Sequence, residues 1–333
     1  MHLRRTIKAL LLAALLTGMV GCGATSPLVL GSNSSALSAK AHKPGELELQ
    51  VFPEATLDRF LNSIKGAKKS IQMQMYMLTL DSVVTELINA ANRGVTVQVM
   101  LESNPFNPEN PASPLPTNRI TARKFQGTKV QLAWTDPTFN FTHSKCVLID
   151  DEAWILSLNL TKSGSEGNRE FAIIDRSPSD VAELKRIFKS DWIHDPYTPK
   201  DPDLVVSPVN SRQQIMDTMK SAKQELIIGV EVAGDPETDA IIKDRLQAGA
   251  KVKVILGHYK KVDCNLEIGR RWQALGAEVR FIAKPFYHAK YLLADGKKGY
   301  MGSVHLTTNS MDKNREIGVI IGNEQALLGK FKE

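Results

Sequence analysis

The sequence predicts an α/β protein made of two similar domains, each a mixed, largely parallel sheet flanked by helices. Strands and helices alternate in the first half of the chain, and the same order returns in the second half. Local sequence repeats as well: Gly94-Val-Thr-Val-Gln-Val matches Gly249-Ala-Lys-Val-Lys-Val, and Gly66-Ala-Lys matches Ser221-Ala-Lys. These matches indicate an internal duplication. A chain of 333 residues is long enough for each half to bury its own core.

The first domain is expected to span residues 46–196. Alternating apolar residues predict strands, and apolar positions three or four apart predict helices. In chain order we expect a strand at 47–52, a helix with apolar positions 57, 60, 61 and 64, a strand at 71–77, a helix at 83–92, strands at 95–101 and 130–134 separated by a helix at 120–125, a hairpin at 141–159, a strand at 171–174 and a helix at 181–192. The proline-rich segment 103–118 follows the end of a strand, so it is either a rim loop of a ligand crevice or a plain surface excursion.

A proline-containing linker at 197–203 separates the halves, and the second domain is expected to span 204–333. Its periodicity repeats the order of the first domain. We expect strands at 204–207, 226–230 and 252–256, alternating with helices at 213–221 and 239–248, and a second hairpin at 286–305.

The amino-terminal residues have the pattern of a signal peptide that is removed during export. Arg4, Arg5 and Lys8 precede a short apolar run that ends at Cys22, which predicts a lipoprotein-type signal peptide at residues 1–21 and lipidation of Cys22. An ordinary secretory signal is the alternative. The segment 22–45 is rich in Ser, Ala and Gly and is expected to be a flexible tether. The protein would then be exported and anchored to a membrane, on the periplasmic face or the cell surface.

Net charge and cysteine content do not by themselves indicate a function. Three of the six net positive charges belong to the predicted signal, so the mature chain carries about +3 and its charge alone does not indicate nucleic-acid binding. After Cys22 only Cys146 and Cys264 remain, and we expect both to be free thiols. We expect no metal site and no cofactor.

Two copies of one motif carry the chemistry. The first contains His143, Lys145 and Asp150, followed by Ser157 and Asn159. Residues two apart on a strand point to the same face, so each histidine lies beside its lysine. Each copy also has a downstream Asn-Arg-Glu, which places Glu170 in the first half and Glu316 in the second. The second copy contains His288, Lys290, Asp295, Ser303 and His305.

Each motif is predicted to form a β-hairpin. A three-residue first loop pairs His143 with Asn159 and Lys145 with Ser157. A two-residue second loop at Asp295-Gly296 pairs His288 with His305 and Lys290 with Ser303. In this register Ser157, Asn159, Ser303 and His305 are candidate phosphate-binding residues. The two aspartates have the opposite strand parity, so we expect Asp150 and Asp295, although part of the catalytic motif, to fix the turns.

This pattern resembles the phospholipase D superfamily, whose signature H-x-K-x(4)-D-x(6)-G-S-x-N occurs twice. The sequence departs from it at Leu156, where glycine is usual, and at His305, where asparagine is usual. The resemblance implies two phospholipase D-like domains that share one active site at a pseudo-two-fold interface. It also implies a phosphohistidine intermediate and imidazoles oriented by Glu170 and Glu316.

The residue types suit phosphodiester cleavage without a metal. One neutral imidazole attacks phosphorus while the other, protonated, donates to the leaving oxygen. We expect His143 to be the nucleophile and His288 the acid and base. Lys145, Lys290, the two serines and Asn159 are expected to stabilise the phosphoryl oxygens.

The leading hypothesis is a phospholipase D-type phosphoric diester hydrolase that cleaves or exchanges phospholipid head groups. Tethering beside lipid and the apolar loop residues Pro105, Phe106 and Leu115 favour it. An exported endonuclease is the alternative, because Lys251–Lys261 and Lys297-Lys298 could follow a phosphate backbone. A cardiolipin-synthase-like phosphatidyltransferase and a weakly active binding module are further alternatives. The expected partner is a phospholipid membrane, nucleic acid is the less favoured partner, and the expected state is a monomer.

Overall fold

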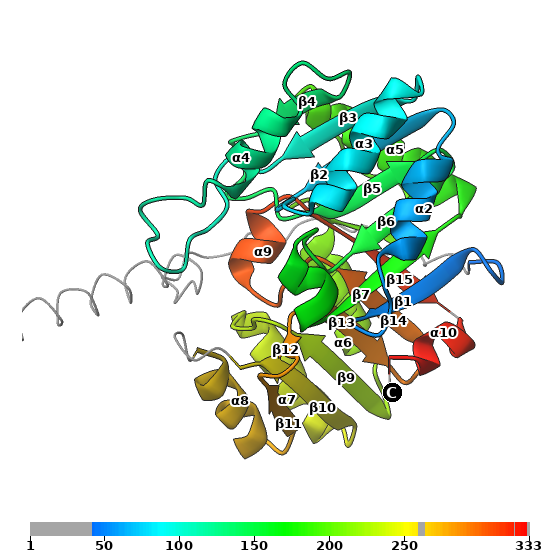
Figure 1. Cartoon of the computed structure of the whole chain (residues 1–333). Helices are drawn as coiled ribbons and strands as arrows, with labels where there is room; N and C mark the ends of the chain where they lie inside the picture. Colours follow the sequence, from blue (N-terminus) through cyan, green and yellow to red (C-terminus); the bar gives the residue numbers. More distant parts are fainter. Residues whose placement is uncertain (1–41, 259–263, 323, 332–333) are drawn as a thin grey trace, which may run out of the picture.

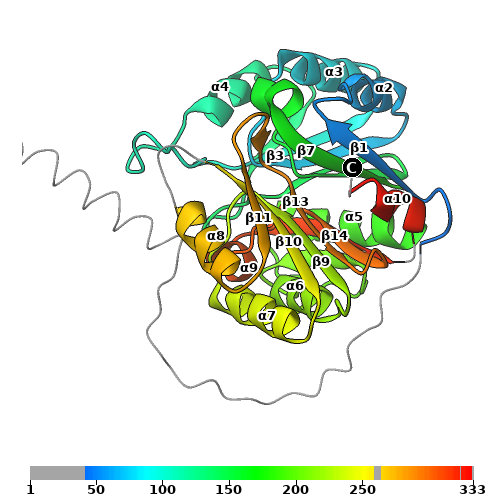
Figure 2. The same ribbon diagram turned by 90° about the horizontal axis from the view of Figure 1, so that it is seen from below.

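The protein is described by a computed structural model covering residues 42–258, 264–322 and 324–331. Two sheets, one from each half of the chain, lie one above the other in both views (Figure 1, Figure 2). The predicted signal peptide, Cys22 and all but the last residues of the predicted tether lie outside the described residues. None of the described helices has the length and apolar character needed to cross a bilayer.

The first half forms the sheet β1-β7-β6-β5-β2-β3-β4. Its predicted elements are present with small shifts at their ends, and helices α2 and α3 cover its outer face (Figure 2). The bounds are β1 Leu47–Phe52, α2 Asp58–Gly66, β2 Ser70–Met75, α3 Asp81–Asn92, β3 Thr96–Leu101, α4 Thr117–Lys124, β4 Gln131–Trp134, β5 Lys145–Ile149, β6 Glu152–Leu156, the short π-helix η1 Ser163–Gly167, β7 Asn168–Asp175 and α5 Pro178–Trp192.

The second half repeats this order as β8-β15-β14-β13-β9-β10-β11, which confirms the duplication at the level of topology. Helices α6 and α7 cover its outer face (Figure 2). The bounds are β8 Leu204–Ser207, α6 Ser211–Lys220, β9 Glu225–Val230, α7 Pro236–Gln247, β10 Lys251–Gly257, α8 Cys264–Ala274, β11 Glu278–Ile282, β12 Phe286–Tyr287, β13 Lys290–Ala294, β14 Lys298–Gly302, α9 Thr308–Asp312, β15 Glu316–Gly322 and α10 Gln325–Gly329.

The sheets are mixed, as predicted, but parallel pairing does not predominate. Among the first half's own described strands only β2–β3 and β3–β4 pair in parallel, and the neighbours from β1 to β2 along the sheet pair antiparallel. The reason is that the motif hairpin β5–β6 inserts beside β2, so β1 is displaced to the far edge, where it pairs with β7. A βαβ crossover from β1 to β2 therefore does not produce adjacent strands.

The described residues form three apolar clusters, and one of them joins the two halves. One lies under α2 and α3 and a second lies under α6, α7 and α8, so each half has an outer core of its own. The third combines α5 with inward-facing residues of both sheets, including Ile173 and Val319. Burial of apolar surface between the sheets thus fixes the two halves relative to each other.

The chain also exchanges backbone pairing between the halves. Strand β12 from the second half pairs in parallel with β7 of the first, and Thr142 forms an isolated bridge with Arg315. The Arg315 guanidinium donates to Asp191 Oδ1 over 2.6 Å, and both side chains are buried. The segment before β13 thus pairs with the start of β7, and the segment before β5 pairs with the residue before β15.

Candidate active site

Both motif histidines lie at the interface between the two halves. His143 lies two residues before the start of β5. Its neighbour Ser144 donates its backbone N–H to the Arg315 carbonyl. His288 precedes β13 in the same way and donates its backbone N–H to the Arg169 carbonyl. The exchanged pairing described above therefore points each histidine into the opposite half.

Each imidazole is oriented by a glutamate of the other half. His143 Nδ1 donates to Glu316 Oε2 over 2.9 Å, and His288 lies 2.6 Å from Glu170 Oε1 through its Nδ1. Both glutamates are fully buried, and each sits at or near the start of a strand, β15 or β7. A buried carboxylate on Nδ1 leaves the opposite ring nitrogen available for chemistry.

The two pairs differ electrostatically. Burial and the charges of Lys145 and Lys290 lower the pKa of His143 well below its usual value, so this ring is neutral. Burial raises the pKa of its partner Glu316 to about 6. For Glu170 burial acts in the same upward direction, but the charge and hydrogen bond of His288 outweigh it and lower the pKa of Glu170. The first pair thus suits a neutral nucleophile and the second an ionised carboxylate beside a proton donor.

The motif lysines are buried beside their histidines. Lys145 donates to the His143 carbonyl over 2.7 Å, and its Nζ lies 5.0 Å from the centroid of the Tyr76 ring. Burial and the charge of Lys290 lower the pKa of Lys145 well below its usual value. Lys290 Nζ lies 3.1 Å from His288 Nδ1. The two buried lysine amines can donate hydrogen bonds to an anion bound beside the histidines.

The motif aspartates do not face the histidines. The Asp150 carboxylate accepts hydrogen bonds from the backbone N–H groups of Lys68, Lys69 and Ser70 over 2.7–2.9 Å. Asp295 does the same with three consecutive backbone N–H groups at residues 223–225, directly before and at the start of β9. Both aspartates also have positive φ at the hairpin turn. They tie each turn to the start of the neighbouring strand, the placement expected for a turn-fixing role.

The predicted hairpin registers are wrong by one residue. In the first hairpin Ile149 pairs with Glu152, so the loop has two residues, and in the second Ala294 pairs with Lys298, so the loop has three. The loop lengths are the reverse of those predicted. A shift of one residue moves every opposing side chain to the other face.

The register shift changes where the motif serines lie. Ser157 Oγ donates to Glu170 Oε2 over 2.6 Å, and the Ser303 side chain hydrogen-bonds to Glu316. Both serines are fully buried. Each serine therefore contacts the glutamate that orients one of the two histidines.

Asn159 and His305 lie at corresponding positions of the two halves. Asn159 Oδ1 and His305 Nδ1 are buried atoms without a hydrogen-bond partner among the described residues. The His305 ring lies 5.1 Å from the His143 ring, centroid to centroid. Burial and the charge of Lys290 lower the pKa of His305 well below its usual value. A third imidazole, which is neutral, thus lies where the superfamily signature has an amide.

Sequence reasoning missed two further residues of the site, Tyr76 and Glu231. Glu231 Oε2 lies 3.0 Å from Lys290 Nζ, 3.1 Å from His288 Nε2 and 3.6 Å from His305 Nε2. One carboxylate oxygen thus occupies a position suited to a phosphoryl oxygen. In the first half Tyr76 packs its ring edge-on to His143 at 4.6 Å.

Alignment of the two halves could have identified Tyr76 and Glu231, because they occupy equivalent positions. Met75 pairs with Lys145 and Val230 pairs with Lys290, so Tyr76 and Glu231 follow equivalent residues. Tyr76 also connects the site to the proline-rich loop, because the Phe106 N–H donates to its hydroxyl over 2.8 Å. That loop projects from the body between β3 and α4 (Figure 1), and its base lies at the site, as the rim-loop alternative requires.

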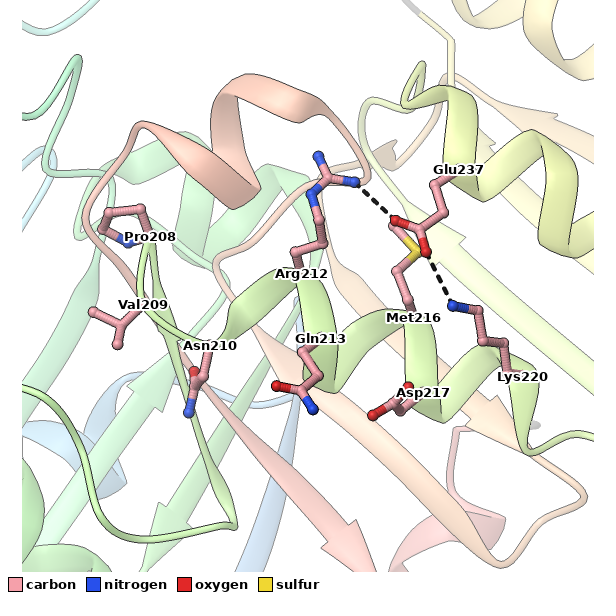
Figure 3. Close-up of a pocket in the computed structure, with 9 residues that line it drawn as sticks. All are labelled: Pro208, Val209, Asn210, Arg212, Gln213, Met216, Asp217, Lys220 and Glu237. Carbon is pink, nitrogen blue, oxygen red and sulfur yellow. Dashed lines mark hydrogen bonds and ion pairs between the residues drawn. The ribbon is translucent and has the colours of Figure 1, made fainter. Parts of the chain in front are cut away.

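A surface pocket elsewhere does not include these residues. It is lined by α6 and the start of α7, with Arg212, Lys220 and Glu237 among its lining residues (Figure 3). Arg212 and Lys220 both pair with Glu237. Because its charged side chains satisfy one another, this pocket is a weaker candidate for anion binding than the histidine site.

Comparison with known proteins defines the class. The chain matches the family described as "Cardiolipin synthase, PLD-like domain" over residues 60–192 and 215–333, one match in each half. The protein therefore belongs to the phospholipase D superfamily. Both matched segments contain one histidine–lysine pair of the site.

Individual relatives agree with this assignment. The chain is similar to phospholipase D of Rickettsia conorii, with 29% identity over 48% of this chain and 76% of the relative. It is similar to cardiolipin synthase 1 of Bacillus anthracis, with 23% identity over 79% of this chain and 60% of that relative. The crystal structure of phosphatidylserine synthase from Haemophilus influenzae has the same fold, with a TM-score of 0.68 at 14% identity, covering 88% of this chain and 86% of that one.

Proposed function

We propose that this protein is a phosphodiesterase of the phospholipase D type that cleaves or exchanges phospholipid head groups through a phosphohistidine on His143. The observation that carries the proposal is the pair of histidines at the domain interface, each oriented by a buried glutamate of the other half. Similarity to a phospholipase D and to cardiolipin synthases supports a lipid phosphodiester as the substrate.

In the first step neutral His143 attacks phosphorus through Nε2, since its Nδ1 is engaged by Glu316. The charge that appears on the imidazole is stabilised by that carboxylate, with which it forms a buried ion pair. His288 gives its proton to the leaving alcohol oxygen. Lys145 and Lys290 stabilise the charge that shifts to the phosphoryl oxygens, and Glu231 must turn aside to admit one of them.

In the second step His288 acts as a base. It removes a proton from water or from an alcohol, which attacks phosphorus and releases His143. Water gives hydrolysis to a phosphatidic acid, and an alcohol gives head-group exchange. A phosphatidyltransferase would use the same residues and differ only in the acceptor. Similarity to cardiolipin synthases supports this alternative.

We further propose that the protein acts at a membrane surface to which lipidation of Cys22 anchors it. The apolar run before Cys22 and the Ser- and Ala-rich segment after it support the proposal. A membrane position would supply substrate to the loop that contains Phe106, which is anchored to Tyr76 beside His143.

The test compares the chain lacking its first 32 residues with its His143→Ala variant. Mixed phospholipid liposomes and single-stranded DNA are offered in parallel, with chelator present, and head-group release and strand cleavage are measured. Release of head group that is lost in the variant supports the proposal, and an added alcohol then reports transfer. DNA cleavage with intact lipid would instead identify an endonuclease, and no product would favour a binding module. A strict requirement for added divalent metal would overturn the metal-independent scheme.

A further inference from the structure

Exposed apolar side chains gather at one edge of the first half, outside the histidine site. Five large apolar side chains are exposed among the described residues, and three of them, Ile120, Trp134 and Ile193, belong to the first half. These three are 50%, 37% and 60% exposed, respectively, so they contribute little to a core. The other two, Val209 and Leu275, lie in the second half. The mechanism above uses none of them.

Printed contacts around Trp134 bring the three side chains of the first half together. Ile120 lies in α4, Trp134 ends the edge strand β4, and Ile193 directly follows α5. The guanidinium carbon of Arg119, next to Ile120, lies 5.9 Å from the centroid of the Trp134 ring. His194, next to Ile193, has its Nε2 3.4 Å from the Trp134 carbonyl oxygen. Three elements thus converge on one exposed surface.

The same surface carries positive charge. The segment 110–135, which contains α4 and β4, has four cationic residues and no Asp or Glu. Lys124 pairs with Asp81, whereas Arg119 and Arg123 are exposed and form no ion pair with another described residue. Exposed arginines beside tryptophan and aliphatic side chains suit the head-group layer of an anionic bilayer. We call this surface the α4–β4 patch, consisting of Arg119, Ile120, Arg123, Trp134 and Ile193.

The patch is connected to the histidine site through the inner face of α4. Asn118 of α4 is fully buried, and its side-chain amide donates to the Tyr76 carbonyl over 2.7 Å. The Tyr76 ring packs against His143. Arg119 also donates to Asn104 Oδ1 over 3.3 Å, in the loop that projects beside α4 (Figure 1, Figure 2). A surface that docks on the patch therefore lies beside the loop and close to the site.

We propose that the α4–β4 patch docks the protein on the surface of an anionic phospholipid bilayer and brings lipid head groups to the histidine site. This inference rests on the proposed function, because it takes a membrane lipid as the substrate. Arg119 and Arg123 bind lipid phosphates, and Trp134 lies at the interface. The aliphatic Ile120 and Ile193 side chains favour a bilayer over nucleic acid, since they can enter the acyl boundary but cannot stack on bases as aromatic rings do.

The experiment measures co-sedimentation with vesicles of phosphatidylcholine alone or with about one third phosphatidylglycerol. It uses the chain lacking its first 32 residues, which retains both sheets and all three apolar clusters, and His143→Ala is present throughout so that no lipid is cleaved. Arg119→Gln/Arg123→Gln should weaken binding to the anionic vesicles about 30-fold, roughly fivefold per charge. Ile120→Ser/Ile193→Ser should weaken it about tenfold. No binding of the parent, equal binding of the arginine variant, or capture of single-stranded DNA in place of vesicles overturns the proposal.

Matched controls come from the second half. Lys243→Gln/Lys251→Gln removes the same charge from exposed residues, and Leu275→Ser removes an exposed apolar side chain; both should bind like the parent. Equal losses in the controls would show non-specific adsorption, and the proposal fails. With His143 restored, the patch variants should release head groups from vesicles more slowly but keep kcat/KM for a dispersed short-chain phospholipid. If no lipid is cleaved in any form, the proposed function fails, while vesicle binding still decides whether the patch docks on a bilayer.

Discussion

Replacing Glu170 by glutamine tests the electrostatic role of the cross-domain pairs. Glu170 Oε1 lies 2.6 Å from His288 Nδ1 and the carboxylate is fully buried. Glutamine keeps the shape of the side chain but removes the charge that favours protonated His288. A hydrogen bond to a charged group contributes about 1.5–3 kcal/mol, so kcat/KM should fall about 10- to 150-fold.

The pH dependence of kcat/KM should also change in Glu170→Gln. Burial acts to raise the pKa of Glu170, but the charge and hydrogen bond of His288 lower it, so the wild-type carboxylate is ionised and Glu170→Gln removes its negative charge from beside the ring. The alkaline limb of the kcat/KM profile should therefore move to lower pH in Glu170→Gln. The assay is head-group release from liposomes between pH 4 and pH 10.

Two controls make this result interpretable. Glu166→Gln changes an exposed carboxylate of the same segment and should leave both the rate and the limb unchanged. Thermal unfolding of Glu170→Gln should show that the variant is folded, since Ser157 can still hydrogen-bond to the new amide. An unchanged rate, or a slower rate with an unmoved alkaline limb, would refute the assignment of His288 as the acid.

Three further outcomes are expected. On the acid side, kcat/KM should fall below about pH 6, because burial raises the pKa of Glu316 to about 6 and protonation removes the partner of His143; an acid limb below pH 4 would contradict this. Glu231→Gln should lower the inhibition constant of inorganic phosphate or vanadate about tenfold, or about 1.4 kcal/mol, because the substitution removes a carboxylate charge that competes for Lys290. An inhibition constant equal to that of the wild type would count against this role. Asp150→Asn should lower the free energy of unfolding by about 1–3 kcal/mol in denaturant titrations and keep most activity per folded molecule, since the carboxylate binds only backbone N–H groups among its described hydrogen-bond partners; a folded variant as inactive as His143→Ala would show a direct catalytic role.

Much of the fold follows from local pattern. The strands at 47–52 and 204–207 have the predicted bounds, because short apolar runs between turn residues leave little freedom. The repeat of glycine-initiated strands correctly indicated that β3 and β10 are equivalent. The prediction of a largely parallel sheet was wrong, because the neighbour of β1 depends on the insertion of a hairpin nearly 100 residues later, which no local pattern indicates.

The site divides in the same way. Residues of one motif lie close in sequence, so the spacing of His143 and Lys145 carried the prediction. The partners that orient them come from the opposite half, and the sequence could not specify that Glu316 serves His143. The predicted cross-strand pairs of the hairpins were wrong because loop length sets the register, and both loop lengths were wrong by one residue.

The proposed mechanism requires His143 to carry the phosphatidyl group during turnover. Wild-type enzyme is mixed with liposomes, quenched in detergent at alkaline pH, where a phosphohistidine survives, digested and analysed by mass spectrometry. We expect an adduct on the peptide containing His143, which is lost in His143→Ala and forms without any added metal. Head-group release with the adduct on His288, or with no adduct on either histidine, would contradict it.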